Sequence, residues 1–307
     1  MFSIAQFGSV CRDTNDSYSD KDLLIVCAVR DRKYYYEKFS REGYSVSTFS
    51  ESQLYNMKKK GSLFLQHLKH EAKILVDENG LFSNFLKDCN LISPTKDEIY
   101  NCKKTIEDLY SWNNDIISIA WKADFLYGSS RDYLIKLLAK NGIFAFGLES
   151  IIEKCSDFFY IEPKSFQPLQ SLRRVKAAYR NNMELPENIF IIKAINDWLN
   201  TLEQKLGFDY DSSCYSDFFI QKRLLSNYER LRYLEVIYIS LVWAGYRHER
   251  HNEIVNFILQ PNLYQSLKKN KTKYIEKYLN ELCPIYKGID LKKLKIPLKS
   301  NVLVQGI

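Results

Sequence analysis

Over residues 1–95 the spacing of apolar positions changes several times, which indicates a mixture of strands and helices. Ile4–Phe7 is a short apolar run that stops at Gly8. Leu23–Val29 (LLIVCAV) is a continuous apolar run rich in Val and Ile, as is typical of a strand buried on both faces. Tyr44–Phe49 alternates between apolar and polar positions, which predicts another strand.

Two segments of the same region have helical character instead. Lys33–Arg41 is predicted to be a helix that ends before Gly43. Leu63–Leu75 (LFLQHLKHEAKIL) places most of its apolar residues at helical spacing, and the turn-forming run 77–80 follows it. We therefore expect a small mixed sheet with helices packed on it.

After Asn90 the strand signals fade and helical patterns follow one another. The predicted helices cover residues 97–126, 130–140, 149–155, 169–180, 189–206, 217–244 (one or two helices) and 253–285. Pro94 stands where the pattern changes, so we place a domain boundary just before it. The expected fold class is α+β, with a small mixed-sheet domain over residues 1–92 and a mainly α-helical domain over residues 93–307.

Length and composition agree with two globular domains. The chain has 307 residues, of which 46% are hydrophobic and 26% are charged, so wholesale disorder is not expected. No run of about 18 apolar residues occurs, and the N-terminus lacks the basic start and apolar stretch of a signal peptide. The protein is therefore expected to be cytoplasmic and to have no membrane partner.

Cysteine and histidine spacing gives little sign of a metal site. The seven cysteines form no Cys-x-x-Cys pair, so they are expected to be buried free thiols in a reducing compartment. The histidines form two pairs spaced by three residues, His67 with His70 and His248 with His251. Neither pair comes with a cysteine partner or a His-Glu-x-x-His pattern, so packed or solvated histidines are favoured over metal ligands.

The segment with the most chemical content joins the first two predicted strands. It contains Gly8 and Ser9 at the end of one strand, a ten-residue gap, and then Asp20 and Asp22 leading into the next strand. Two carboxylates two residues apart on an extended segment leave the same face, where a hard divalent cation relieves their repulsion. A glycine followed by a serine at a turn allows backbone N–H groups to approach phosphate oxygens. The pattern therefore predicts a phosphate cradle that faces a metal clamp.

These residues resemble the signature of the DNA polymerase β-type nucleotidyltransferase superfamily, in which Gly-Ser is followed about a dozen residues later by Asp-x-Asp. The small bacterial members often read Gly-Ser-x-x-Arg-Gly and then Ser-Asp-x-Asp-Leu. Here Gly8, Ser9 and Arg12 match the first part, and residues 19–23 (SDKDL) match the second. Asp13 replaces the second glycine, and the resemblance extends over about residues 1–80.

The resemblance implies a metal-dependent nucleotidyltransferase that uses a nucleoside triphosphate. It implies that Gly8 and Ser9 hold the triphosphate, with Arg12 beside them, and that Asp20 and Asp22 ligate both Mg²⁺ or Mn²⁺ ions. Two such ions stabilise the attacking and the leaving oxygen of an in-line displacement. The family also implies a third carboxylate on a later strand, where it helps to activate the acceptor hydroxyl.

The third carboxylate is where this sequence departs from the family. The predicted strand Tyr44–Phe49 contains no acidic residue, and Glu51 just beyond its end is the candidate for this role. Loss of a general base typically lowers a rate by about 10²–10⁴-fold. A degenerate nucleotidyltransferase-like protein that binds or scaffolds a partner, in a toxin–antitoxin or phage-defence pair, is therefore the alternative to an enzyme.

Charge bears on the acceptor substrate. The formal net charge is +7, and residues 268–299 hold ten lysines and three acids, which favours a polyanionic partner such as RNA over a protein or small-molecule acceptor. The alternative for this segment is a solvated lysine-rich surface. The helix predicted at 169–180 places Arg173, Lys176 and Arg180 on one face. This face is a candidate to bind the triphosphate or an RNA backbone, and the alternative is a solvated side of the helix.

Overall fold

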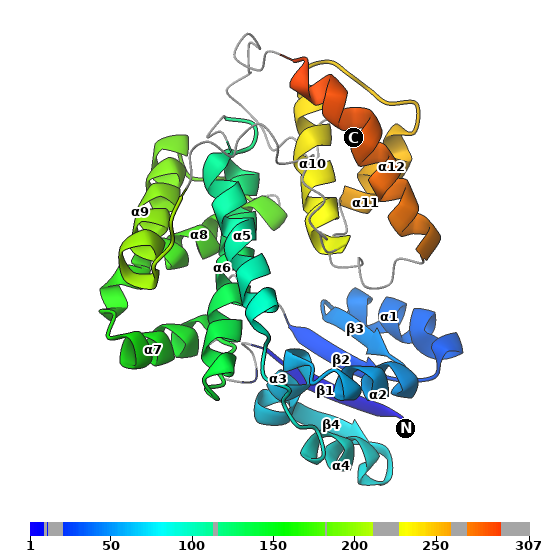
Figure 1. Ribbon diagram of the computed structural model, residues 1–307. Helices are drawn as coiled ribbons and strands as arrows, with labels where there is room; N and C mark the ends of the chain where they lie inside the picture. Colours follow the sequence, from blue (N-terminus) through cyan, green and yellow to red (C-terminus); the bar gives the residue numbers. More distant parts are fainter. Residues whose placement is uncertain are drawn as a thin grey trace. The chain divides into compact units, whose positions relative to one another are not determined.

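The computed structural model describes residues 1–8, 11, 21–112, 116–181, 183–210, 227–258 and 269–289. The fold is α+β, as predicted: a four-stranded sheet is built from the N-terminal part of the chain, and the rest of the described chain is helical (Figure 1). None of the helices in these ranges is both long enough and apolar enough to cross a membrane.

The sheet has the order β3-β2-β1-β4. Its strands are β1 (Ser3–Phe7), β2 (Asp22–Val26), β3 (Ser45–Phe49) and β4 (Lys73–Asp77). β1 pairs antiparallel with both β2 and β4, whereas β2 and β3 are parallel. The sheet is therefore mixed, and the start of β2 lies beside the end of β1.

The central strand β2 is buried on both faces, as its continuous apolar run predicts. Leu24 and Val26 belong to one core, and Leu23 and Ile25 belong to the other. Side chains alternate along a strand, so this division shows which way each residue of β2 points. By the same alternation Asp22 lies on the face of Leu24 and Val26.

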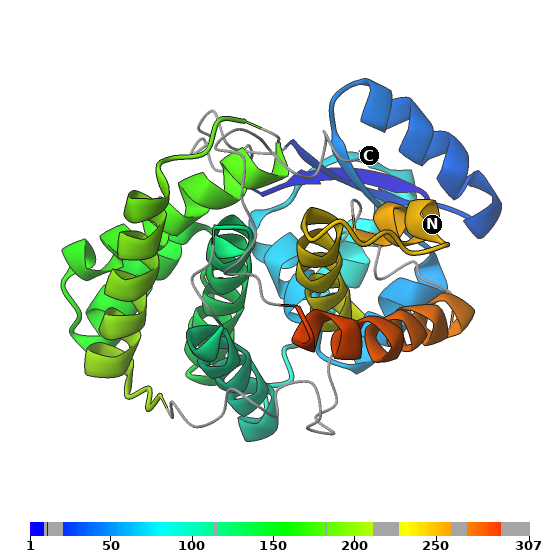
Figure 2. The same cartoon turned by 90° about the horizontal axis from the view of Figure 1, so that it is seen from above.

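Helices cover the two faces of the sheet (Figures 1 and 2). α1 (Arg32–Arg41) packs on the face of Leu23. The other face is covered by α2 (Glu51–Lys59), α3 (Leu63–Glu71) and α4 (Leu81–Lys87). α2 begins with a capping box, in which Ser50 and Gln53 bond to each other's backbone N–H.

The helix predicted over Leu63–Leu75 is wrong in its second part. α3 ends at Glu71, Ala72 is extended, and Lys73 begins β4. The residues after Ala72 continue the apolar pattern of the helix, so spacing alone favours a longer helix. These residues form a strand because they pair with β1, from Ser3–Asp77 to Gln6–Lys73. Such distant pairing is not visible in local periodicity.

The helices beyond the sheet are α5 (Lys96–Ser111), α6 (Ile119–Lys140), α7 (Leu148–Phe159), α8 (Gln167–Arg180), α9 (Asn188–Leu206), α10 (Asn227–Trp243), α11 (His251–Ile258) and α12 (Lys269–Lys287). The single helix predicted over residues 97–126 is wrong, because one helix ends at Ser111 and the next begins at Ile119. The helices predicted over 149–155, 169–180 and 189–206 differ from the observed ones only at their ends. The break expected between residues 126 and 130 is wrong, because α6 runs through Gly128 without interruption.

Two compact units make up the chain. The first combines Met1–Cys102 with Arg131–Lys164, and the second combines Lys103–Ser130 with Ser165–Ile307. Two of the three divisions fall inside α5 and α6, and the third falls within the 3-10 helix Pro163–Phe166. The sequence does not suggest that residues 131–164 group with the sheet. The boundary expected after Ile92 stays a prediction.

In the second unit α10 packs against α11 and α12 (Figure 2). All residues of α10 from 231 to 241 are buried, which is typical of a helix that is enclosed on every side. Arg232, Glu235 and Ser240 are among these buried residues, so polar groups lie inside this core. A buried charge is costly unless it is paired, and these charges are paired with partners described below.

Candidate functional site

Gly8 and Asp22 meet at one end of the sheet. Phe7, the last residue of β1, is the register partner of Asp22, the first residue of β2. Gly8 has a φ of +82°, and a Cβ at this position would lie 2.4 Å from Oδ2 of Asp22. The backbone of Gly8 and the carboxylate of Asp22 are therefore so close that only glycine fits without displacing the acid.

A turn follows directly. The backbone N–H of Cys11 donates to the carbonyl of Gly8 at 3.2 Å. On the other side of β2, the N–H of Ser45 donates to the carbonyl of Lys21 at 2.9 Å, and Ser45 is the register partner of Asp22. Asp22 thus lies where β1 ends and where β2 and β3 begin.

Several predicted site residues lie outside the described residues. These are Ser9, Arg12 and Asp20. Of the two carboxylates predicted to hold a metal ion, the structure therefore describes Asp22. Within the described residues, no group of three or more His, Cys, Asp and Glu side chains is arranged to hold a metal ion.

The structure does not bring Glu51 to Asp22. β3 runs parallel to β2, so Ser45 lies beside Asp22 and Phe49 lies beside Val26. Glu51 follows Phe49 and is consequently at the opposite end of the sheet, where its Oε2 accepts from the Met1 amino group at 3.1 Å. Alternation along a strand determines the face of the sheet on which a side chain lies, whereas the direction of the strand determines which end of the sheet the side chain reaches.

Another carboxylate lies at the same end of the sheet as Asp22. α3 ends at Glu71, and two residues later Lys73 pairs with Gln6 of β1. Oε2 of Glu71 is 3.0 Å from Nε2 of His67, one helical turn earlier. The sequence places these two residues at helical i, i+4 spacing, which is the signal that could have identified them.

Aromatic rings surround His67. Its ring lies edge-on to Phe7, with centroids 5.7 Å apart, and stacks on Phe146 at 4.7 Å. His70 stacks on Phe144 in the same way at 4.8 Å. Arg131 fixes the segment that carries both phenylalanines, since its Nη2 donates to the carbonyl of Phe146 at 2.6 Å. The two histidines therefore face separate aromatic partners.

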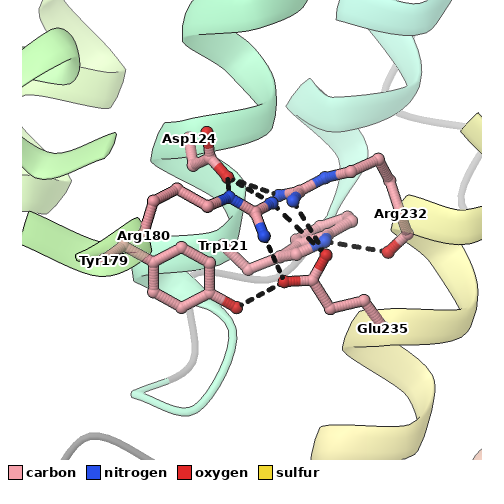
Figure 3. A network of polar contacts seen from close by, with 6 residues as sticks. All are labelled: Trp121, Asp124, Tyr179, Arg180, Arg232 and Glu235. Carbon is pink, nitrogen blue, oxygen red and sulfur yellow. Dashed lines mark hydrogen bonds and ion pairs between the residues drawn. The ribbon is translucent and has the colours of Figure 1, made fainter. Parts of the chain in front are cut away.

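The basic face predicted on α8 divides into two parts. Arg173 and Lys176 are partly exposed, and Nζ of Lys176 lies 5.2 Å from the centre of the Tyr127 ring. Arg180 instead joins a buried network of charges in the second unit (Figure 3). The expectation that Arg180 binds a phosphate or lies on a solvated helix face is therefore wrong.

The buried network contains two arginines and two carboxylates. Arg180 lies 2.6 Å from Asp124 and 3.3 Å from Glu235, and Arg232 lies 2.8 Å from each of the same carboxylates. The hydroxyl of Tyr179 donates to Glu235 at 2.8 Å. These residues come from α6, α8 and α10, so the network joins three helices.

Burial governs the electrostatics of this network. Burial raises the pKa of Glu235 from its ordinary value of 4.5 to about 7, although Arg180 acts in the opposite direction. Burial also raises the pKa of Tyr179, and Glu235 adds to that effect. For Arg180, burial favours the neutral form, but Glu235 and Asp124 outweigh it and raise the pKa further. Such a network supports packing of the helices and is costly to break.

Comparison with models of known protein families finds no match for this chain, and comparison with curated proteins finds none either. The function therefore has to be inferred from the residues and their geometry.

Proposed function

We propose that this protein is a metal-dependent nucleotidyltransferase that transfers a nucleoside monophosphate group from a nucleoside triphosphate to an acceptor. The observation that carries the proposal is the contact between Gly8 and Asp22. A Cβ at Gly8 would collide with Oδ2 of Asp22, so the absence of a side chain lets the backbone lie directly against the carboxylate. That arrangement suits a triphosphate bound along the backbone with a cation between it and the acid.

Each residue of the motif has a distinct part in this proposal. Gly8 and Ser9 bind phosphate oxygens through backbone N–H and hydroxyl groups, with Arg12 adding positive charge. Asp20 and Asp22 hold Mg²⁺ or Mn²⁺, which supplies charge stabilisation of the transferring phosphoryl group when bound. Arg173 and Lys176 are further candidates for binding the nucleotide.

The reaction itself is a substitution at the α-phosphorus. A bond forms between the acceptor oxygen and the α-phosphorus, and the bond from that phosphorus to the bridging oxygen breaks, so that pyrophosphate leaves. The acceptor hydroxyl must also lose its proton to a base. The residues of the site therefore bind and orient the triphosphate, and a further group is needed to accept that proton.

A second candidate function is a degenerate nucleotidyltransferase-like protein that binds nucleotide or scaffolds a partner. The observation that favours it is β3, in which Ser45 and Ser47 stand on the face of Asp22 where the family resemblance implies an acid. Such a protein would bind nucleoside triphosphate without transferring it. A toxin–antitoxin or phage-defence pair is the proposed setting.

We propose RNA as the favoured acceptor, with a protein or a small molecule as alternatives. The proposal is supported by the excess of lysine over residues 268–299, of which the structure describes residues 269–289. We also propose that the protein is cytoplasmic. The described cysteines are all free thiols, as is expected in a reducing compartment.

The decisive experiment is incubation of the protein with each α-³²P-labelled nucleoside triphosphate, Mg²⁺ or Mn²⁺, and either total RNA or protein extract. The enzyme proposal expects one macromolecular fraction to become labelled by the parent and not by Asp22→Asn. Metal-dependent binding of nucleotide without any labelling favours the scaffold. Absence of both binding and labelling would overturn the proposal.

A further inference from the structure

The geometry points to His67 and Glu71 as the proton-accepting pair of the transfer reaction, with His67 as the base and Glu71 as its positioning residue. This inference rests on the proposed nucleotidyltransferase function. It assigns to α3 the role that a carboxylate on β3 would otherwise have. Four properties of the pair support it: its place at the end of the sheet, the face on which it lies, its burial, and its chemistry.

The strand register shows that Glu71 and Asp22 lie at the same end of the sheet. Gln6 and Lys73 form the last pair of the ladder between β1 and β4, and Glu71, the last residue of α3, comes two residues before Lys73. On the other side of β1, Phe7 pairs with Asp22. Neighbouring strands lie about 5 Å apart. Glu71 and Asp22 therefore flank the same short stretch of β1, and Glu51 does not.

The two hydrophobic cores on either side of the sheet show that His67 and Asp22 lie on the same face. Phe7 belongs to the core beneath α2, α3 and α4, as do Leu24 and Val26. Asp22 has the parity of Leu24, so its side chain leaves on that same face. His67 lies against the ring of Phe7, whose register partner is Asp22. The histidine and the aspartate are thus on one face at one end of the sheet.

The pair itself is largely withdrawn from water. The side chains of His67 and Glu71 are only 12% and 16% exposed, and Nε2 and Oε2 are 3.0 Å apart. Phe146 stacks on the imidazole and fixes the plane of the ring.

The chemistry follows from the hydrogen bond. With the Nε2 proton donated to Glu71, Nδ1 of His67 carries the lone pair that can accept a proton. The acceptor hydroxyl gives its proton to Nδ1 as its oxygen bonds to the α-phosphorus, and pyrophosphate departs with the electron pair of the broken P–O bond. Glu71 holds the ring in this tautomer and stabilises the imidazolium that forms, as a carboxylate does for the histidine of acyl-transfer triads.

The test compares three variants of the full chain in the labelling assay with α-³²P nucleoside triphosphates. Glu71→Gln keeps the size of the side chain and its capacity for a hydrogen bond. His67→Ala removes the base, and His70→Ala removes the other stacked histidine of α3 as the matched control. Binding of each labelled triphosphate is measured separately by equilibrium dialysis with Mg²⁺.

We expect Glu71→Gln and His67→Ala to slow transfer by about 10²–10⁴-fold, with triphosphate binding changed less than about 3-fold. Added imidazole should restore part of the activity of His67→Ala, which it would not do if His67 only packed against Phe146. His70→Ala should transfer at the parent rate. If His67→Ala does not fold, Glu71→Gln alone decides between the two roles.

The outcomes separate this inference from the proposed function. A parent that labels its acceptor together with an equally active Glu71→Gln overturns the inference and leaves the transferase proposal standing. A parent that binds triphosphate but transfers nothing overturns the role of His67 and supports the scaffold. A parent that binds no triphosphate overturns the proposed function and the inference with it.

Discussion

The backbone of Gly8 and the carboxylate of Asp22 lie so close that a Cβ on the glycine would be 2.4 Å from Oδ2 of the acid. The two residues are 14 positions apart along the chain, and the antiparallel pairing of β1 and β2 brings them together. The left-handed φ of +82° at Gly8 adds a second reason why no other residue suits this position.

Gly8→Ala should therefore disrupt the site more than it disrupts the fold. Positive φ alone costs an alanine about 1–2 kcal/mol, and the new methyl group would also displace Asp22. We expect loss of metal-dependent triphosphate binding, measured by equilibrium dialysis. Gly43→Ala is the matched control, because Gly43 has a φ of +85° with nothing within 4 Å of the added Cβ. Equal loss of binding in both variants would show that strain, not the collision with Asp22, is responsible.

Asp22→Asn should abolish metal-dependent triphosphate binding while leaving the fold intact. The change removes the charge that attracts a divalent cation but keeps the shape of the side chain at the start of β2. If Asp20 lies beside Asp22 as the motif predicts, the change also relieves repulsion between the two carboxylates, so we expect the free energy of unfolding to be unchanged or slightly higher. Asp157→Asn, at an exposed position of α7, serves as the control for loss of one carboxylate. Unaltered triphosphate binding by Asp22→Asn would remove the metal clamp from the proposal.

The sequence predicts the sheet where the pattern is local and fails where pairing is distant. The run LLIVCAV identifies β2 because both of its faces are apolar. β4 is hidden because Ile74 and Leu75 extend the apolar pattern of α3, and only pairing with β1 makes them a strand. The short spacing between Gly8 and Asp22 agrees with their meeting, since two consecutive strands that pair antiparallel bring the end of the first to the start of the second.

The positions of Glu51, Glu71 and Arg180 in the fold could not be predicted from their spacing in the sequence. Glu51 has the parity of Ser45, but a parallel strand carries it to the far end of the sheet. Glu71 reaches the Asp22 end because a helix happens to terminate there, and a helix end is poorly fixed by pattern. Arg180 has charged partners 55 and 56 residues away, so helical spacing alone presents it as part of a surface face.

Arg180→Met should strongly destabilise the second unit. Removal of one partner from a buried ion pair leaves the other charge uncompensated, at a cost of about 3–5 kcal/mol. Both Asp124 and Glu235 would lose a partner, and Arg232 alone would face them. The free energy of unfolding in urea measures the effect. Arg174→Met, on the exposed side of the same helix, should change it by less than about 0.5 kcal/mol.

Glu235 should make the stability of the same unit depend on pH. Its pKa is about 7 in the folded protein against an ordinary value of 4.5, so the native state holds a proton that the unfolded chain releases. This contribution to stability is fully present below pH 4.5 and is lost as the pH rises through about 7. Glu235→Gln removes the titrating group. The difference in unfolding free energy between parent and variant should therefore change over this interval, and a constant difference would contradict the raised pKa.

Changing the lysines of α12 tests whether the acceptor is RNA or a small molecule. Ile275, Tyr278 and Leu282 are buried along one side of the helix, which leaves Lys273 and Lys287 exposed on the rest of its surface. Each lysine that contacts a phosphate releases counterions when RNA binds, so the affinity falls with salt and the logarithmic slope is about 0.7 per contact on a single strand. If α12 binds RNA, changing both lysines to glutamine should weaken binding and reduce that slope by about 1.4. The control changes Lys154 and Lys164, two lysines already paired with Glu153 and Glu162, and should leave the slope as it is. Equal slopes in all three proteins would exclude α12 as an RNA contact and direct the search to protein or small-molecule acceptors.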